Sequence, residues 1–235
     1  MTYFYLVPKW FLKFSIGIEI FFAVIALAVA LFAIKIYSIS RQREIRLFGV
    51  SFFLISFSYL ISTLINLAVI SPTIIRLAQL TTSNIARLGV VGIFSYTLLF
   101  ISGLITLAYT TLRIKSGKVY YIILSLGLII MITPLIIVTF LYGPIEFRSL
   151  YTILLTFRIL SVFLLIFILY NYVEEYVRKK NKKTLLVVVA FFFLLTSNTE
   201  FIFSLAYYEA YIIGHILEFI AYLFILLSLI LTIRK

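Results

Sequence analysis

Five ionisable residues lie inside apolar stretches of this 235-residue chain: Glu19, Arg158, Glu200, His215 and Glu218. Ionisable groups inside a bilayer are costly, and each is a functional-site hypothesis. Carboxylates and an imidazole can exchange protons or bind cations, whereas a guanidinium can hold an anionic group or neutralise a carboxylate. We therefore predict a ligand- or ion-binding site at these residues, and no catalytic or metal site.

The five groups share a common depth in their apolar stretches. At 1.5 Å per residue they lie roughly 8–14 Å from one membrane surface, whereas random placement would scatter them. Tyr222 falls on the helix face of His215 and Glu218, and Asn66 shares a face with Ser62, so both join the candidate site. The other neutral polar residues expected in this layer are Ser58, Tyr59, Ser95, Ser102, Thr106, Tyr151, Ser197 and Ser204. The pattern predicts a polar pocket near the outer surface above a hydrophobic inner half.

Each of these groups also has a purely structural interpretation. Arg158 can pair with Glu200 or Glu218 and tie helices together. Glu19 can extend to the interface along its helix, and His215 can be a hydrogen-bonding partner between helices. A zinc or iron site at His215 and the three glutamates is the weakest alternative, because it would have one nitrogen ligand and no sulfur.

The composition indicates a membrane protein. Hydrophobic residues make up 64% of the chain, compared with about 45–50% in soluble domains, and the mean hydropathy is +1.22. There is no cysteine, which excludes disulfides and thiol chemistry, and all eight acidic residues are glutamates. The net charge of +12 comes from cations at the ends of apolar stretches, so the membrane explains it without a nucleic-acid partner.

Seven apolar stretches each approach the roughly 20 residues that cross the hydrocarbon core of a bilayer. They cover residues 11–35, 47–70, 88–112, 120–142, 150–173, 184–207 and 211–233. The sequence therefore predicts one all-α integral membrane domain over residues 1–235, a seven-transmembrane-helix bundle.

The connections between these stretches predict the orientation. One side carries 14 of the 20 lysines and arginines, and such residues stay cytoplasmic. We expect a multi-pass protein of the cell membrane with its N-terminus outside and its C-terminus cytoplasmic. The densest basic run can also attract anionic lipid, although orientation alone explains it; it comprises Arg178, Lys179, Lys180, Lys182 and Lys183.

A short internal similarity suggests a repeat. The segment VSFFLISFS at 50–58 resembles VAFFFLLTS at 189–197. Two three-helix units in the same orientation, joined by the helix over 120–142, would give a 3+1+3 parallel repeat like those of some transporters. Coincidence between common apolar residues is the alternative.

Three known families share part of this pattern. Microbial rhodopsins resemble the chain in helix count and orientation, but their retinal needs a lysine in the last helix, and none lies between Glu209 and Ile233. The 3+1+3 sugar transporters resemble it in plan and length, but their Pro-Gln signature is missing. CAAX-processing metalloproteases resemble it loosely at Glu174–Arg178, with a different spacing and without the additional histidines. The prediction therefore includes no cofactor.

A transporter or channel-like protein for a small solute, a proton or a cation is the favoured function. In that interpretation Arg158 holds an anionic group or neutralises a glutamate, and Glu218, Glu200 and His215 handle protons or cations. A complete sensor would need an output domain, so the main alternative is a receptor or sensory subunit that signals to a separate partner. A membrane-embedded metal enzyme is the weaker alternative. Beyond the bilayer, the expected partners are a second copy of the chain or that signalling partner.

Overall fold

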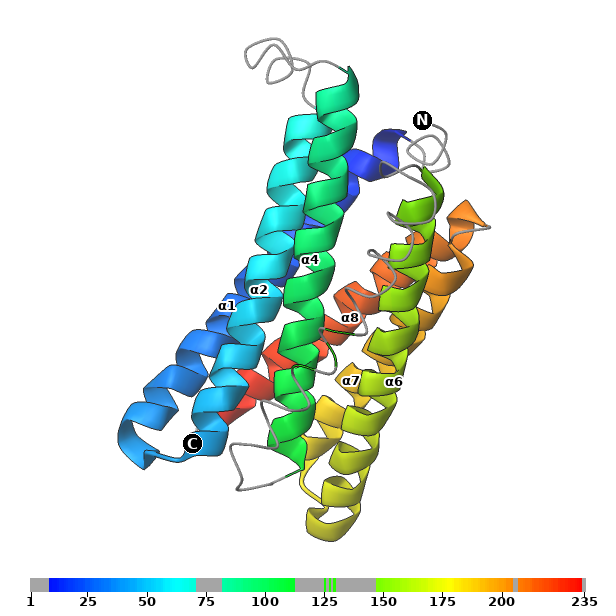
Figure 1. Ribbon diagram of the computed structural model, residues 1–235. Coiled ribbons are helices and arrows are strands. Elements are labelled where there is room, and N and C mark those ends of the chain that lie inside the picture. Colours follow the sequence, from blue (N-terminus) through cyan, green and yellow to red (C-terminus); the bar gives the residue numbers. More distant parts are fainter. Residues whose placement is uncertain are drawn as a thin grey trace.

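Six long helices make up the described part of this computed structural model, which covers residues 9–70, 82–112, 147–204 and 207–233 and the helical positions 125, 127 and 129. The helices are α1 (Lys9–Ser40), α2 (Arg43–Ile70), α4 (Thr82–Thr111), α6 (Phe147–Lys179), α7 (Lys182–Phe203) and α8 (Tyr208–Ile233), as shown in Figure 1. Each contains a stretch long and apolar enough to cross a membrane, so the chain is a multi-pass membrane protein. Apart from those three positions, the predicted helix over 120–142 lies outside the described residues.

The helical form follows from the solvent. In lipid every backbone N–H and C=O must be bonded within the segment, which a helix achieves. None of the four prolines falls within the six helices. Three helices are longer than predicted. Helix α1 continues past residue 35 to Ser40, α4 begins before residue 88 at Thr82, and α6 continues past residue 173 to Lys179. Hydropathy marks only the part in lipid, whereas the polar end of α6 continues in water with a Glu175–Lys179 ion pair across one turn.

Two helices end in the same way at the basic end of the bundle. Arg41 after α1 and Lys180 after α6 have φ angles of 55° and 47°, in the left-handed region. Their backbone N–H groups donate to the carbonyl oxygens of Tyr37 (2.8 Å) and Tyr176 (2.7 Å). A left-handed residue stops a helix, and its N–H satisfies one of the last carbonyl oxygens of that helix. The chain therefore reverses sharply into the next helix at both places.

The six helices form a closed ring in the order α1, α2, α4, α6, α7, α8, with α8 returning to α1. Packing is most extensive within two sets, which we call the first helix group (α1, α2 and α4) and the second helix group (α6, α7 and α8). Figure 1 shows the first group on the left and the second on the right, with α8 crossing behind. The contacts of α4 with α6 and of α8 with α1 join the groups and are the least extensive.

Small residues allow α1 and α2 to approach closely. Ala23, Ala26, Ala30 and Ala33 of α1 are each at most 4% exposed. The hydroxyl of Ser56 in α2 donates to the carbonyl oxygen of Ala23 over 2.7 Å. Helices in membranes associate through such close packing and polar contacts rather than through a hydrophobic driving force.

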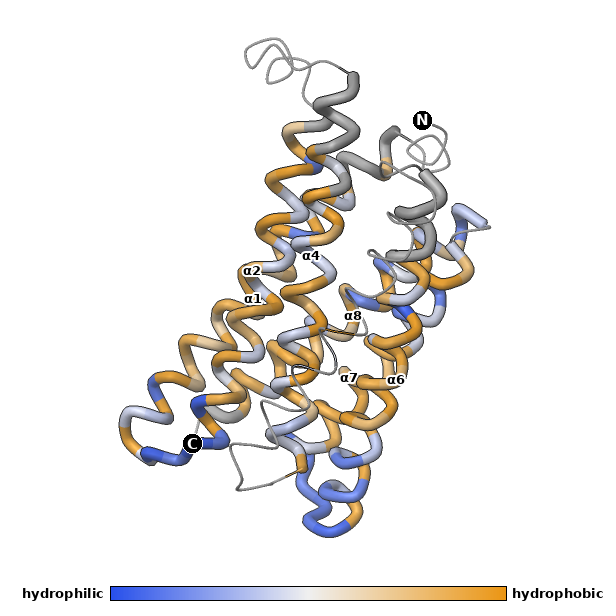
Figure 2. Tube along the Cα trace, in the orientation of Figure 1, coloured by the Kyte–Doolittle hydropathy of each residue, from blue (hydrophilic) through white to orange (hydrophobic). Residues whose placement is uncertain are grey.

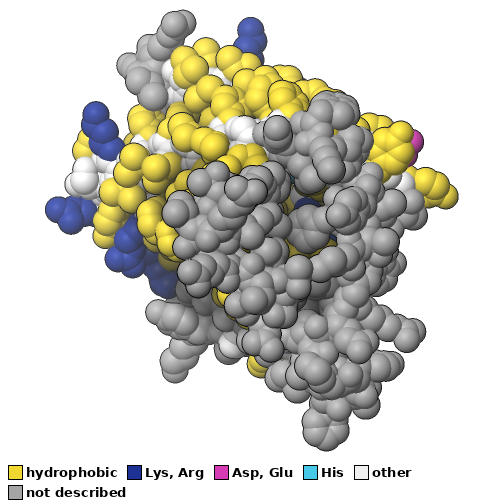
Figure 3. Space-filling model, turned by 90° about the horizontal axis from the view of Figure 1, so that it is seen from above, with side chains coloured by type: hydrophobic (Ala, Val, Ile, Leu, Met, Phe, Trp, Pro, Cys, Tyr) yellow, Lys and Arg dark blue, Asp and Glu magenta, His cyan; other side chains and the backbone are white. Residues whose placement is uncertain are grey.

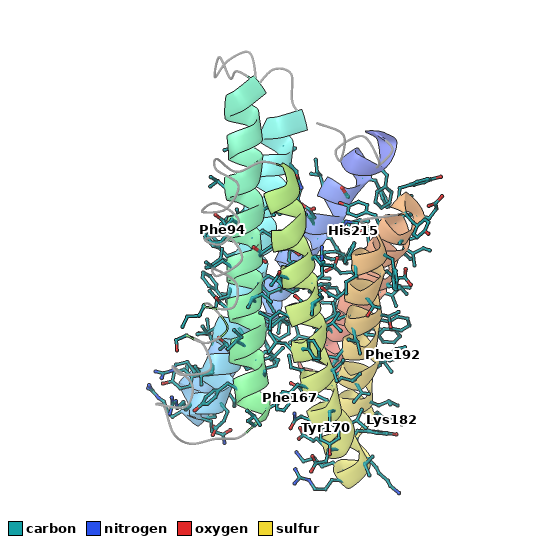
Figure 4. All side chains as sticks on the ribbon, turned by 45° about the vertical axis from the view of Figure 1, so that its right-hand side comes forward. Phe94, Phe167, Tyr170, Lys182, Phe192 and His215 are labelled. Atoms are coloured by element: carbon teal, nitrogen blue, oxygen red, sulfur yellow. The ribbon has the colours of Figure 1, made fainter. Side chains whose placement is uncertain are left out.

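The outward faces are apolar along most of their length. Phe167, Tyr170 and Phe192, which Figure 4 labels, are 36%, 66% and 53% exposed. Hydrophilic residues gather at the helix ends and at a few positions between the helices, as Figure 2 shows. Large exposed apolar side chains are expected where the surrounding solvent is lipid.

Five aromatic side chains fill the middle of the ring and form what we call the aromatic layer: Phe22, Tyr59, Phe100, Phe157 and Tyr222. Each is at most 3% exposed. Ring centroids are 4.7 Å apart for Phe22 and Tyr222, 5.9 Å for Tyr59 and Phe100, and 5.7 Å for Phe100 and Phe157. Because five of the six described helices contribute one ring each, the layer joins the two helix groups.

Replacing Gly103 by alanine is expected to destabilise the protein by about 1–3 kcal/mol, the usual cost of overpacking. The added Cβ would lie 2.7 Å from Ile55 Cγ1 and 2.9 Å from the carbonyl oxygen of Ser51, so α4 would be pushed away from α2. Thermal unfolding of the purified protein in detergent measures the change. Gly17→Ala is the control, because its Cβ would meet nothing within 4 Å. Equal melting temperatures for the two variants would contradict this packing.

Candidate functional site

A cavity of about 210 Å³, which we call the polar cavity, lies where all six described helices meet. Its lining residues come from the first halves of α1, α4, α6 and α8 and from the last halves of α2 and α7. Its polar lining consists of Glu19, Tyr59, Ser62, Asn66, Tyr96, Arg158, Tyr211, His215 and Glu218. Figure 3 looks onto this end of the bundle, where a basic side chain is visible in a small recess with hydrophobic atoms beside it.

Glu218 is held from two sides. The hydroxyl of Tyr59 donates a short hydrogen bond to Glu218 Oε1, and His215 Nδ1 lies 3.5 Å from Oε2. Glu218 is 2% exposed and His215 is 6% exposed. Neither ring nitrogen of His215 has a hydrogen-bond partner among the described residues, and the imidazole packs edge-on against Tyr211 and Phe201. Both nitrogens are buried within the packing, with Nδ1 facing the Glu218 carboxylate.

Glu19 comes from α1 and is met by two side chains of α2, Asn66 and Thr63. Asn66 Nδ2 lies 3.3 and 3.2 Å from the two carboxylate oxygens, and Thr63 Oγ1 lies 3.4 Å from Oε2. Asn66 Nδ2 also approaches Ser62 Oγ at 3.4 Å. These contacts lie at or beyond the long end of the usual range, which reaches about 3.2 Å for N–H···O and about 3.0 Å for O–H···O bonds. The carboxylate of Glu19 thus keeps acceptor capacity toward the cavity.

Arg158 supplies the positive charge of the site. Its Nη1 donates to Asn198 Oδ1 over 3.1 Å, and its guanidinium carbon lies 4.1 Å from the Phe201 ring centroid and 4.9 Å from that of Phe157. Stacking on aromatic faces stabilises a guanidinium without neutralising it. Among the described residues Arg158 belongs to no ion pair, so the predicted pairing with Glu200 or Glu218 is absent.

The structure brings five of the seven predicted site residues to this cavity: Glu19, Asn66, Arg158, His215 and Glu218. It does not bring the other two. Tyr222 lies one turn beyond Glu218 and stacks on Phe22 in the aromatic layer, and Glu200 does not line the cavity. Binding of a ligand or ion by any of these residues stays a prediction.

Glu200 was placed wrongly because the inner face of α7 was misjudged. The prediction put Ser197, Glu200 and Ser204 on that face. Ser197 is indeed buried there, but the buried residues centre on Leu194, Asn198 and Phe201. Glu200 lies about 120° around the helix from that centre. Asn198, which is fully buried and holds Arg158, was missed. A stripe of buried residues every three to four positions was the signal that could have found it.

Helix α4 also differs from its prediction. Ser102 and Thr106, expected in the polar layer, donate to the carbonyl oxygens of Leu98 and Ser102 within their own helix, each over 2.7 Å. Tyr96 lines the cavity instead, between Gly92 and the aromatic layer. Hydroxyl groups on a helix can satisfy themselves locally, so their position says little about a site.

No protein-family model, curated protein or solved structure matches this chain. Its function therefore has to be argued from its own residues. The described part of the chain contains no group of three histidine, cysteine or acidic residues arranged to hold a metal ion.

A second cavity of about 540 Å³ opens at the opposite end of the bundle, so the inner half is largely hydrophobic, as expected, but is not a solid plug. Apolar side chains such as Val29, Phe52 and Ile225 line its deep part, and Glu44 and Arg178 lie at its mouth. All six described helices contribute to it, as they do to the polar cavity. The two cavities therefore lie on one axis through the ring, with the aromatic layer between them.

Tyr59→Phe is expected to cost about 1–3 kcal/mol of stability, because it keeps the ring but removes the donor to a buried carboxylate. Tyr59 is 2% exposed and Glu218 Oε1 is its partner. Thermal unfolding in detergent measures the change against Tyr170→Phe, whose ring is 66% exposed. An unchanged melting temperature for Tyr59→Phe would show that this hydrogen bond does not contribute to the fold.

Proposed function

We propose that this protein is a transporter that moves a small solute, coupled to protons or cations or alone, through the centre of the helix ring. The observation that carries the proposal is the pair of cavities at opposite ends of the ring, separated by a packed zone that contains the aromatic layer. Transporters hold their sites near the middle of the bilayer, between two structural units that rock against each other. The two helix groups, joined by their less extensive contacts, are candidates for such units.

The barrier between the cavities is thinnest along α2 and α8. Along α2 the polar cavity reaches Tyr59 and the second cavity reaches Phe52, and along α8 the corresponding residues are Glu218 and Ile225. Each pair is separated by seven residues, or about 10 Å of helix. Rotation of a few aromatic rings, together with a small shift between the two helix groups, would open a connection between the two cavities.

Seven crossings form part of the proposal. The polar cavity is lined by the first half of both α4 and α6, so these helices run in the same direction. The chain between Leu112 and Phe147 therefore has to connect opposite ends of the bundle, which supports the helix predicted over 120–142. The basic residues of the loops support a cytoplasmic C-terminus and, with it, a polar cavity that faces the outside of a cell membrane.

The proposal also includes a parallel 3+1+3 repeat. One spacing of 139 residues relates Tyr37 to Tyr176, the left-handed Arg41 to the left-handed Lys180, and VSFF at 50–53 to VAFF at 189–192. It also relates five buried α2 residues (Ser51, Phe52, Ile55, Ser58 and Tyr59) to five buried α7 residues (Ala190, Phe191, Leu194, Ser197 and Asn198). A coincidence of apolar residues would not extend to the turns, so these matches support the repeat.

The decisive experiment is flux through the purified protein in proteoliposomes. A pH or salt gradient is imposed, internal pH is followed with an entrapped dye, and exchange of labelled amino acids, amines and carboxylates is followed by filtration. Protein-dependent movement of an ion or solute above that of protein-free liposomes is expected. If nothing moves under any of these gradients, the transporter proposal is wrong.

A sensory subunit is the second candidate, favoured by the exposed basic end of α6 and α7, which could meet a signalling partner or a second copy of the chain. Arg178, Lys179, Lys180 and Lys182 are exposed there and Lys183 is partly buried. Anionic lipid is the other proposed partner of these residues. Ligand binding without any flux in proteoliposomes would favour the sensor over the transporter.

The orientation is testable because the chain has no cysteine of its own. Ser40→Cys lies at the end of α1, and Tyr207→Cys lies between α7 and α8 at the other end, where the native side chain is 65% exposed. A maleimide that cannot cross membranes is expected to label Tyr207→Cys in intact cells, and Ser40→Cys only after the membrane is opened. The reverse labelling pattern would overturn the proposed topology.

A further inference from the structure

The polar cavity carries opposite charges on opposite walls. Glu19 and Arg158 both line it, and they are 139 residues apart, so they occupy equivalent positions in the proposed repeat. Their helices, α1 and α6, occupy opposite positions in the six-helix ring, with two helices between them on each side. They therefore face each other across its centre. Glu218 adds a second carboxyl group from α8, which is the neighbour of α1.

These charged groups have capacity that the protein does not use. A guanidinium has five N–H donors, and Arg158 spends Nη1 on Asn198, the one hydrogen-bond acceptor it has in the described helices. The contacts to Glu19 are 3.2–3.4 Å long. A buried polar group without a partner costs free energy, which a ligand would recover.

Size and charge together restrict the ligand. The volume of about 210 Å³ corresponds to about seven water molecules at 30 Å³ each. A solute with only an ammonium group would leave Arg158 without a counter-charge, and a solute with only a carboxylate would leave Glu19 and Glu218 without one. A buried charge without a partner is strongly destabilising. A molecule with both charges satisfies both walls.

We propose that the polar cavity binds a small zwitterion, with its ammonium group at Glu19 and Glu218 and its anionic group at Arg158. The imidazole of His215 lies beside Glu218, at the end of the cavity that takes the ammonium group. The inference rests on the proposed function in one respect: the zwitterion is the solute that the transporter moves. Binding itself does not depend on transport, so the two are tested separately.

The test is isothermal titration calorimetry on the full-length protein in detergent. The zwitterions are leucine and 4-aminobutyrate, and their single-charge analogues are 3-methylbutylamine with 4-methylpentanoate, and propylamine with butyrate. At least one zwitterion is expected to bind roughly tenfold or more tightly than both of its analogues, since each charge adds 1.4 kcal/mol or more. If neither zwitterion binds, or if an analogue binds as tightly, the proposal is overturned.

Variants of Arg158 test whether this residue binds the anionic group of the zwitterion. Arg158→Gln is expected to reduce the affinity for the zwitterion to that of its amine and to leave the affinity for the amine unchanged. Arg178→Gln, in the second cavity, is the matched control and should change neither. If Arg158→Gln does not fold, Arg158→Lys keeps the charge and should retain part of the preference for the zwitterion over the amine. Loss of amine and zwitterion binding in equal proportion with Arg158→Lys would contradict the assignment.

Flux separates this proposal from the proposed function. Zwitterion binding without exchange of the labelled zwitterion in proteoliposomes would leave the site standing and refute the transporter. Proton or cation flux without zwitterion binding would refute the zwitterion and leave the transporter standing.

Discussion

Glu218→Gln is expected to reduce the protein-dependent flux in proteoliposomes by roughly tenfold or more, which corresponds to 1.4 kcal/mol or more. Glutamine has the shape of glutamate, so it can still accept the hydrogen bond from Tyr59, and its amide can face His215. The substitution therefore removes the charge and the titratable proton without removing the contacts. Stability should change little while transport falls, which separates a functional role from a structural one.

Glu209→Gln is the matched control for this experiment. Glu209 lies in the first turn of the same helix and is exposed, so the same chemical change should leave the flux unaltered. Both variants should unfold at nearly the parent temperature. Full flux with Glu218→Gln would remove this carboxyl group from the transport mechanism.

The second large effect is expected from exchanging the two facing charges. Glu19→Arg or Arg158→Glu alone places like charges on opposite walls of the cavity and should reduce flux by roughly tenfold or more, because like-charge juxtaposition costs several kcal/mol. The double exchange restores one charge of each sign. The neighbouring side chains can accommodate the double exchange. Asn66 beside position 19 and Asn198 beside position 158 can each donate or accept a hydrogen bond.

The double exchange should therefore recover flux to within roughly tenfold of the parent, a coupling that a double-mutant cycle measures directly. Glu19→Gln with Arg158→Gln is the control, because it removes both charges and should not recover. If the double exchange is no better than the worse single variant, the two residues do not act across one site.

Much of the fold was predictable because a bilayer allows few solutions. The six described helices fall on predicted apolar stretches, since length and hydropathy decide which segments can cross. Their ends were not predictable in the same way. Glu174 and Lys179 are hydrophilic and yet helical, because a helix does not have to stop where the lipid stops.

The candidate site was predictable in its chemistry and less so in its geometry. Charged residues in apolar helices indicated Glu19, Arg158 and Glu218 by their cost alone. Asn198 was missed because helix rotation depends on what the neighbouring helices bury. The second cavity was missed as well, because an apolar residue such as Phe52 has the same hydropathy whether it packs tightly or borders a void.

The matching turns at Arg41 and Lys180 bear on the ancestry of the protein. Two identical three-helix chains that associated as a symmetric pair would present the same residue type at both positions now held by Glu19 and Arg158. A pair of that kind could hold two acids or two bases, but never one of each. If the halves arose by gene duplication, the two copies became free to diverge, and so a ligand with two different ends could be bound in one direction.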